Sequence, residues 1–284
     1  MNAIETTRKP DWLKKKIDLA KCLDLHRLFG QLELNTVCKE AHCPNISECF
    51  SAKVATFLIL GNICTRKCRF CAVKKGIPQP IDSNEPQRLA EAVKKLGLKH
   101  VVITSVTRDD LADGGAEAFV QNIKGLKFLN PGLKVEVLVP DFQGDARLIK
   151  RVIQAGCDIF AHNIETVPEL YSQVRADSDY QRSLKVLKTA KEIDCNIYVK
   201  SGIMLGLGET EKQLSEVLTA IKKTGCDFLS IGQYLAPSKS HYPVKEFIHP
   251  DKFVFYKQKA EELGFTHVES GAYVRSSYLA SEYL

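Results

Sequence analysis

The sequence predicts an α/β fold, a partial (β/α)6 barrel of the TIM type with an N-terminal extension and a C-terminal tail. Two observations support this prediction. Apolar segments rich in β-branched residues recur along the chain, and they alternate with segments of helical spacing. The apolar segments are nearly continuous, which is typical of parallel strands buried on both faces.

The predicted elements form six strand-and-helix units. Strands are expected at 54–60, 100–104, 134–139, 158–163, 196–205 and 227–234. Segments of helical spacing lie between them, for example 86–96, 116–128, 146–154, 180–193 and 211–223. This alternation implies βαβ units in a parallel sheet. Because no Gly-x-Gly-x-x-Gly follows the first strand, an open dinucleotide-binding sheet is the weaker alternative.

Three cysteines stand where a predicted helix meets the next strand: Cys157, Cys195 and Cys226. We predict that all three are small, buried, apolar residues. Gly156 and Gly225 precede two of them and can provide the caps that end their helices.

Composition predicts an ordinary soluble protein. Of the 284 residues, 44% are hydrophobic and 26% are charged. The net charge of +6 is spread along the chain, so it indicates a solvated surface or a preference for acidic partners. The chain has no stripe of basic residues interleaved with aromatic residues, so binding to nucleic acid is not indicated. The longest apolar run, 54–60, is far shorter than the roughly 20 residues of a membrane span. Since the N-terminus is polar and mixed in charge, a cytoplasmic location is expected.

Cysteine content is unusual. The chain has 10 cysteines, and six of them lie between Cys38 and Cys71. A secreted disulfide scaffold would be shorter and would carry a signal segment. Clustered cysteines in a reducing compartment indicate metal or redox chemistry instead.

One cysteine group follows the first predicted strand. Cys64, Cys68 and Cys71 are spaced x3 and x2 on one loop. In a βα barrel the chemistry lies at the carboxyl ends of the strands. Structural zinc normally takes four protein ligands, and four-iron clusters usually take four cysteines. Three thiolates therefore favour a cluster with one open iron; a half-filled zinc ribbon is the alternative.

This C-x3-C-x-aromatic-C pattern, with Phe70 as its aromatic residue, resembles the signature of the radical S-adenosylmethionine superfamily. The resemblance implies a [4Fe-4S] cluster on the three cysteines, whose open iron binds the methionyl part of S-adenosylmethionine. It also implies that an electron from the cluster splits this cofactor to a 5′-deoxyadenosyl radical. Phe70 is expected to provide an apolar wall beside the open iron.

An upstream group, Cys38, Cys43 and Cys49, has the spacing x4 and x5 in a polar segment of little periodicity. We expect it to bind a second metal or cluster. A zinc site completed by His42 and a loop with incidental cysteines are the alternatives. The two groups together resemble the lipoyl synthases; biotin synthases have only the downstream group. The resemblance implies an auxiliary [4Fe-4S] cluster here.

This resemblance also divides the chain into three expected parts. They are an N-terminal extension at 1–53 with the upstream cysteines, the partial barrel of the radical S-adenosylmethionine superfamily at 54–265, and a tail at 266–284 that helps to hold the auxiliary cluster.

The polar clusters at the predicted strand ends resemble the same family. We expect the cofactor-binding residues among them, together with Phe70, to be Thr104, Ser105, Asn163, Glu165, Lys200, Gly206, Gly208, Glu209, Gln233 and Tyr234. Gly206 and Gly208 let the backbone approach a flat ligand such as adenine. Glu209 and Asn163 can accept hydrogen bonds from ribose or ammonium groups. Loop capping is the alternative, with Glu209 and Thr210 starting the next helix.

The tail contains Arg-Ser-Ser-Tyr at 275–278. From the residues alone it is a solvated end, and nothing selects Ser277 over Ser276 or Ser281. In the family this second Ser supplies the fourth ligand of the auxiliary cluster, so the resemblance implies that role for Ser277. A serine oxygen is a harder donor than a thiolate, so its iron is expected to be released more easily. Arg275 is expected to hold the tail or the substrate peptide.

The resemblance implies the following activity. The radical abstracts hydrogen from unactivated carbons of an octanoyl chain on a lysine of a lipoyl carrier domain, and the auxiliary cluster gives sulfur to carbons 6 and 8. Such bonds are too strong for acid–base chemistry, so a cofactor must break them. The expected partners are lipoyl domains of 2-oxoacid dehydrogenases or the glycine cleavage H protein, an electron donor such as flavodoxin or ferredoxin, and an iron–sulfur cluster carrier. Nucleic acid and membranes are not expected.

Three other functions remain open at this point. They are another radical enzyme with an auxiliary cluster, such as a methylthiotransferase, a non-enzymatic iron–sulfur carrier, and a zinc-stabilised binding module. The tail motif argues against the first. The polar strand-end motifs around an open three-cysteine site argue against the second.

Overall fold

A computed structural model describes residues 9–14, 27, 29–40, 43, 45, 49, 55–278 and 280–283 of the chain, without the side chains of Cys38, Lys39 and Ser281. Its strands are β1 (Asn35–Thr36), β2 (Thr56–Ile59), β3 (Ile63–Cys64), β4 (Lys74–Lys75), β5 (His100–Ser105), β6 (Lys134–Leu138), β7 (Ile159–Ala161), β8 (Tyr198–Leu205), β9 (Phe228–Gln233) and β10 (His267–Gly271). Its α-helices are α2 (Val37–Glu40), α4 (Glu85–Leu96), α5 (Ala116–Leu129), α6 (Ala146–Gln154), α7 (Tyr171–Val174), α8 (Tyr180–Ile193), α9 (Glu211–Lys223) and α10 (Pro250–Glu262). Short 3-10 turns lie at Asp11–Leu13, Phe142–Gly144, Pro168–Leu170 and Ala280–Glu282.

The strands form a curved sheet of eight, in the order β1-β2-β5-β6-β7-β8-β9-β10. All neighbouring pairs are parallel except β1 and β2. The strand order does not reverse, so the sheet has no switch point of the dinucleotide-binding kind. The predicted partial barrel is therefore confirmed, with all six predicted strands and all five predicted helices.

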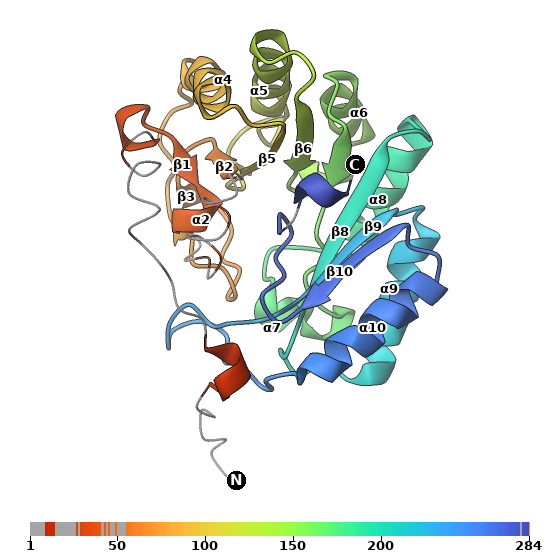
Figure 1. Ribbon diagram of the computed structural model, residues 1–284. Coiled ribbons are helices and arrows are strands. Elements are labelled where there is room, and N and C mark those ends of the chain that lie inside the picture. The colour runs from red at the N-terminus through yellow and green to blue at the C-terminus, as the bar shows by residue number, and fades with distance from the viewer. Residues whose placement is uncertain are drawn as a thin grey trace.

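The helices lie outside the sheet, and the last part of the chain lies on its inner side (Figure 1). The structure adds α10 and β10, which the sequence analysis did not predict. β10 pairs with β9 from His267 to Gly271, so the segment predicted as a tail begins with a strand.

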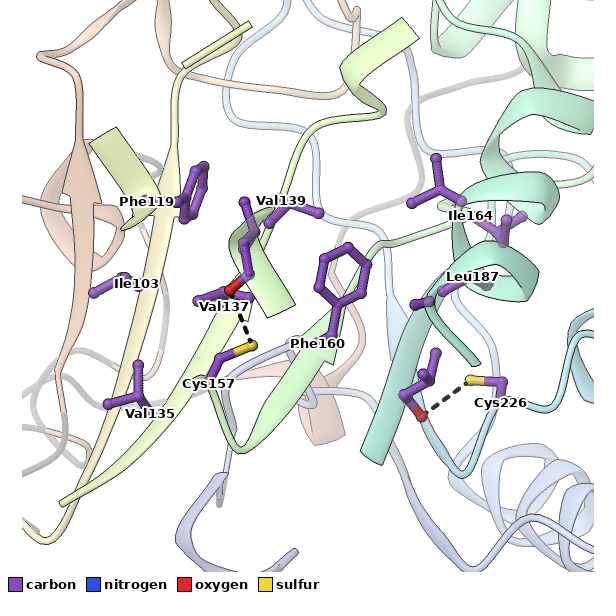
Figure 2. Packing of buried hydrophobic residues seen from close by; sticks show 14 of the residues in the cluster. Ile103, Phe119, Val135, Val137, Val139, Cys157, Phe160, Ile164, Leu187 and Cys226 are labelled. Atoms are coloured by element: carbon purple, nitrogen blue, oxygen red, sulfur yellow. Dashed lines mark hydrogen bonds between the residues drawn. The ribbon is translucent and has the colours of Figure 1, made fainter. Parts of the chain in front are cut away.

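The core lies between the sheet and its helices. Ile103, Phe119 and Phe160 are fully buried there, as Figure 2 shows. Cys157 and Cys226 are buried too, and each thiol approaches a backbone carbonyl oxygen, at 3.9 and 3.4 Å. These two predictions are confirmed.

The prediction that Cys195 is buried is wrong, because this residue is exposed. After α8 ends at Ile193, the turn stays at the surface, and Ile197 provides the buried apolar contact. The predicted glycine caps are confirmed by positive φ angles of 100° at Gly156 and 86° at Gly225.

Candidate active site

The downstream cysteines lie on a loop that follows β2 at the carboxyl edge of the sheet. The chain leaves β2 through Leu60 and Gly61, both with positive φ. β3 and β4 then pair in a small ribbon, which brings the two ends of the cysteine loop together. The Cys64 thiol accepts a hydrogen bond from the backbone N–H of Thr107, after β5, at 3.3 Å. The loop is thus fixed to the neighbouring strand.

The three thiols form one half-buried group. Burial raises the pKa of Cys68 to about 12; Arg175 opposes this shift, and Cys71 and Cys64 add to it. Burial also raises the pKa of Cys71. Without a cation to bind them, the Cys68 and Cys71 thiols stay protonated at neutral pH, whereas coordination would deprotonate them. In the described part of the chain, no three His, Cys, Asp or Glu side chains are arranged to hold a single metal ion. The donor set fits a cluster with an open position.

Arg66, within the loop, anchors it to the rest of the barrel. Its guanidinium binds Asp109 at 2.7 and 2.9 Å and Asp141 at 2.7 and 2.9 Å. Burial of Asp141 opposes its ionisation, but the hydrogen bonds from Arg66 prevail and hold its pKa at about 2. A cavity of about 130 Å³ beside these carboxylates is lined by Thr107 and Gln143. Sequence reasoning missed Arg66; an arginine between two of the predicted ligand cysteines was the available signal.

Asn163 and Glu165 follow β7, and Glu165 acts electrostatically on two of the cysteines. Glu165 has a φ of 72°, and its carboxylate accepts a hydrogen bond from the Asn163 side chain at 3.0 Å. Burial raises the pKa of Glu165, and Arg175 opposes that shift. Glu165 in turn adds to the raised pKa values of Cys68 and Cys71. Strained backbone beside a buried carboxylate is typical of a functional site.

Several buried polar atoms at these strand ends have no hydrogen-bond partner among the described residues. They are Ser105 Oγ, Arg108 Nη1, His162 Nε2, Asn163 Oδ1 and Thr166 Oγ1. Such atoms are rare in native structures, because each costs about 1–3 kcal/mol. They follow β5 and β7, where a barrel binds its ligands. A polar ligand would provide the missing partners.

Hydrogen bonds within the loop after β8 hold it in shape. Both oxygens of Glu209 accept backbone N–H bonds, from Gly206 at 2.6 Å and Leu207 at 2.9 Å. A Cβ at Gly206 would lie 2.3 Å from Gln233 Nε2, so only glycine fits there. Gln233 Nε2 donates to three carbonyl oxygens, those of Leu205, Tyr234 and Glu246. Thr210 caps α9, which is the predicted alternative role for this stretch.

Other predicted residues line the site or support it. Phe70 packs against Leu207, Tyr234 and Tyr242 in a small apolar cluster next to the cysteine loop. The Tyr234 hydroxyl donates to the Tyr242 carbonyl oxygen at 2.6 Å. The Thr104 hydroxyl donates a hydrogen bond to the Leu138 carbonyl oxygen at 2.7 Å. Gly208 has a φ of 111°.

Lys200 does not lie with the other predicted residues. It is the third residue of β8 and pairs in register with Phe228, the first residue of β9. Its ammonium lies 3.1 Å from the Glu136 carboxylate and 3.7 Å from the centre of the Tyr283 ring. The Lys200 ammonium is thus held on the amino-end side by Glu136 and Tyr283, while its backbone is in register with Ala161, the last residue of β7.

The upstream cysteines lie partly outside the described residues. His42 is not described, nor is the Cys38 side chain. Cys43 and Cys49 are half-buried, and the Cys49 N–H donates to the Asn45 carbonyl oxygen at 2.9 Å.

The tail passes directly beside this upstream motif. The Asn45 side chain donates to the Tyr273 carbonyl oxygen at 2.6 Å. Burial lowers the pKa of Arg275, and the nearby Cys43 opposes that shift.

The tail then enters the barrel. Ser276 Oγ accepts a hydrogen bond from Asn163 at 2.5 Å, and Ser277 Oγ accepts one from Thr56 Oγ1 at 2.7 Å. Two glycines inside strands make room for it. A Cβ at Gly232 would lie 2.2 Å from the Val274 carbonyl oxygen, and one at Gly202 would lie 2.9 Å from Asn163 Oδ1. Sequence reasoning missed both, although a glycine inside a strand often marks a close backbone approach.

Comparisons with known proteins identify the family. Residues 58–231 match the Radical SAM superfamily. Methylornithine synthase has a similar fold, with a TM-score of 0.58 at 16% identity over 91% of this chain and 79% of that one. The chain is a member of the radical SAM superfamily, which implies S-adenosylmethionine and a [4Fe-4S] cluster.

Two curated relatives identify it more narrowly. A lipoyl synthase of Caldicellulosiruptor saccharolyticus is 58% identical over 277 residues, 97% of each chain. A lipoyl synthase of Geotalea uraniireducens is 54% identical over 280 residues, 99% of each chain. The chain belongs to the lipoyl synthase family, and it is an enzyme, a sulfurtransferase.

No helix in the described part of the chain is long and apolar enough to cross a membrane.

Proposed function

We propose that this enzyme inserts two sulfur atoms, at carbons 6 and 8, into an octanoyl group carried on a lysine of a lipoyl carrier domain. One observation carries the proposal. The Asn163 side chain donates both to Glu165, which faces the downstream thiols, and to Ser276 of the tail, which reaches the upstream motif. One residue therefore links the two cysteine groups that the reaction requires.

Cys64, Cys68 and Cys71 would hold the first cluster and would leave one iron open for S-adenosylmethionine. When bound, these two groups supply the radical chemistry that removes hydrogen from an unactivated carbon. The unpartnered Ser105 Oγ and Asn163 Oδ1 provide hydrogen-bonding positions for the polar parts of the cofactor. The remaining predicted contacts, including Phe70, Thr104, Glu165, Gly206, Gly208, Glu209, Gln233 and Tyr234, shape the walls and the loop of this site.

Cys38, Cys43, Cys49 and Ser277 would hold the auxiliary cluster, which would supply the sulfur. Two contacts support Ser277 as its fourth ligand: the tail meets Asn45 through Tyr273, and Arg275 lies near Cys43. Thr56 holds the Ser277 hydroxyl in place. The division into an extension at 1–53, a barrel at 54–265 and a tail at 266–284 belongs to this proposal, as does a cytoplasmic location.

The carrier is a lipoyl domain of a 2-oxoacid dehydrogenase or the glycine cleavage H protein. An electron donor such as flavodoxin or ferredoxin and an iron–sulfur cluster carrier complete the set of partners. The deciding experiment is an anaerobic single-turnover assay with an octanoyl-lysyl peptide, dithionite and S-adenosylmethionine. We expect 5′-deoxyadenosine and a peptide that carries two added sulfurs.

A matched variant separates the two cysteine groups. Cys49→Ala should still form 5′-deoxyadenosine but should give no thiolated peptide, because it lacks only an auxiliary ligand. Full thiolation by Cys49→Ala would show that the sulfur comes from elsewhere. A wild-type enzyme that forms neither product would reject the function.

A further inference from the structure

Two segments contain no acidic residue: the one that includes the cysteine loop, and one that packs against it. Residues 61–81 and 232–245 lack Asp and Glu but contain seven Lys and Arg residues. One of the seven, Arg66, is buried between Asp109 and Asp141. The other six are exposed, and we call them the basic rim: Lys67, Arg69, Lys74, Lys75, Lys239 and Lys245.

Direct contacts join the two segments. The Tyr242 N–H donates to the Arg69 carbonyl oxygen at 2.9 Å. The Cys71 carbonyl oxygen lies 3.2 Å from His241 Nε2 and accepts a hydrogen bond from Lys75 Nζ at 3.1 Å. Lys74 lies next to Lys75 in the ribbon. Four members of the basic rim thus lie on or directly after the cysteine loop, and the segment that carries the other two, Lys239 and Lys245, packs against that loop.

The charge of the basic rim is uncompensated. No member forms an ion pair with any described residue, whereas cations elsewhere do: Lys191 pairs with Asp227, and Lys252 with Glu211. The Asp177 carboxylate lies near Lys67, but it accepts a hydrogen bond from the backbone N–H of that residue, at 3.4 Å, and does not pair with the ammonium group. Unpaired charge of one sign on one face creates a potential that attracts and orients an oppositely charged partner.

Ile77, two residues after Lys75 in the chain, offers an apolar anchor, because it is 91% exposed. An apolar centre with a charged rim is the usual composition of a protein interface. Nucleic acid fits less well, because single-stranded binding sites stack bases on exposed aromatic rings. Tyr234 and Tyr242 are buried.

We propose that the basic rim and Ile77 dock an acidic one-electron donor protein. This inference rests on the proposed function, which needs the cluster on Cys64, Cys68 and Cys71 to be reduced. A partner on this surface contacts the residues that hold the Cys71 carbonyl, so its redox group lies close to the cluster. One electron leaves the donor and enters the cluster; no bond forms or breaks, and no proton moves.

The test compares two double charge reversals in the holoenzyme. Lys74→Glu/Lys239→Glu removes one cation from each segment of the basic rim. Lys124→Glu/Lys150→Glu, on α5 and α6, changes the net charge equally at exposed lysines far along the chain from the rim. The probe is reduced flavodoxin, mixed anaerobically in a stopped-flow instrument. The readout is the bleaching of the cluster absorbance, with dithionite reduction measured in parallel.

We expect the rim variant to be reduced by flavodoxin at least about 10-fold more slowly than the control at low salt, and the difference to shrink as salt rises. Dithionite should reduce all forms at similar rates. Equal flavodoxin rates in both variants would overturn the proposal. So would a rim variant that is reduced normally but binds the octanoylated carrier domain more weakly, because the surface would then belong to the carrier. Dithionite-driven turnover of the wild type tests the proposed function separately.

Discussion

At the amino end of the barrel interior, Lys200 and Glu136 form a buried ion pair, whereas at the carboxyl end several buried polar atoms have no hydrogen-bond partner among the described residues. Lys200 and Glu136 are 1% and 0% exposed, and Tyr283 covers the lysine. Ser105 Oγ and Asn163 Oδ1, by contrast, have no partner among the described residues. Both ends bury polar groups in one sheet.

The difference separates structural from functional roles of buried polar groups within a single sheet. A buried charge that is paired is compatible with a stable fold, while an unpartnered buried atom costs stability unless a ligand binds it. We therefore expect substitutions at the amino end to reduce the free energy of unfolding. Substitutions at the carboxyl end should reduce activity instead. The tail connects both ends, from Ser276 beside Asn163 to Tyr283 beside Lys200.

The largest expected effect is loss of cofactor cleavage in Cys68→Ala. Its half-buried thiol makes few structural contacts, so the free energy of unfolding of the apo-protein should change by less than about 1 kcal/mol. Iron should fall from about eight to about four per chain, as one cluster is lost, and 5′-deoxyadenosine should be undetectable. Iron analysis and product chromatography measure this. Cys195→Ala, at the exposed cysteine, is the matched control and should change neither quantity; an unaffected Cys68→Ala would break the comparison.

At the amino end, Lys200→Met should destabilise the fold by about 3–5 kcal/mol, because it leaves Glu136 buried without its main partner. His100, whose Nε2 lies 3.6 Å from the carboxylate, is then the other basic side chain that faces it among the described residues. Urea unfolding of the apo-protein measures the loss. The double variant Lys200→Met/Glu136→Leu should recover most of the stability, since no buried charge remains. If Lys200→Met were fully stable but unable to cleave S-adenosylmethionine, the lysine would belong to the site after all.

This contrast also shows what the sequence can and cannot predict. The six strands and the cysteine loop are local patterns, and all of them were predictable. β10 was missed because His267–Gly271 is short and half-polar. Lys200 has the same sequence context as the site residues, but its direction depends on Glu136, 64 residues away. The Thr56–Ser277 contact spans 221 residues, so only the resemblance to a family could single out this serine.

Acid should destabilise the carboxyl end through His162. Burial lowers the pKa of His162 from 6.5 to about 4, and Arg175 adds to this shift. Its Nδ1 contacts the Val139 carbonyl oxygen at 2.9 Å. Between these two pH values the unfolded chain binds a proton that the folded chain does not, so stability falls as pH falls. The contribution is about 3 kcal/mol. Urea unfolding from pH 7 to 4 should show that the free energy of unfolding falls as pH falls. His162→Gln should make this dependence on pH less steep. If the dependence were unchanged in His162→Gln, the loss of stability would come from other groups.

The smallest effect tests the tail between the two ends. In Gly232→Ala the new methyl would lie 2.2 Å from the Val274 carbonyl oxygen, so the backbone of the tail must move. We expect a loss of about 1–3 kcal/mol, as for other overpacked sites. Limited proteolysis should cut the tail faster than in wild type. Gly30→Ala is the control, because a Cβ at Gly30 meets nothing within 4 Å. If Gly232→Ala matched that control in both measurements, the tail would not pass closely along β9, and the two ends would be independent of each other.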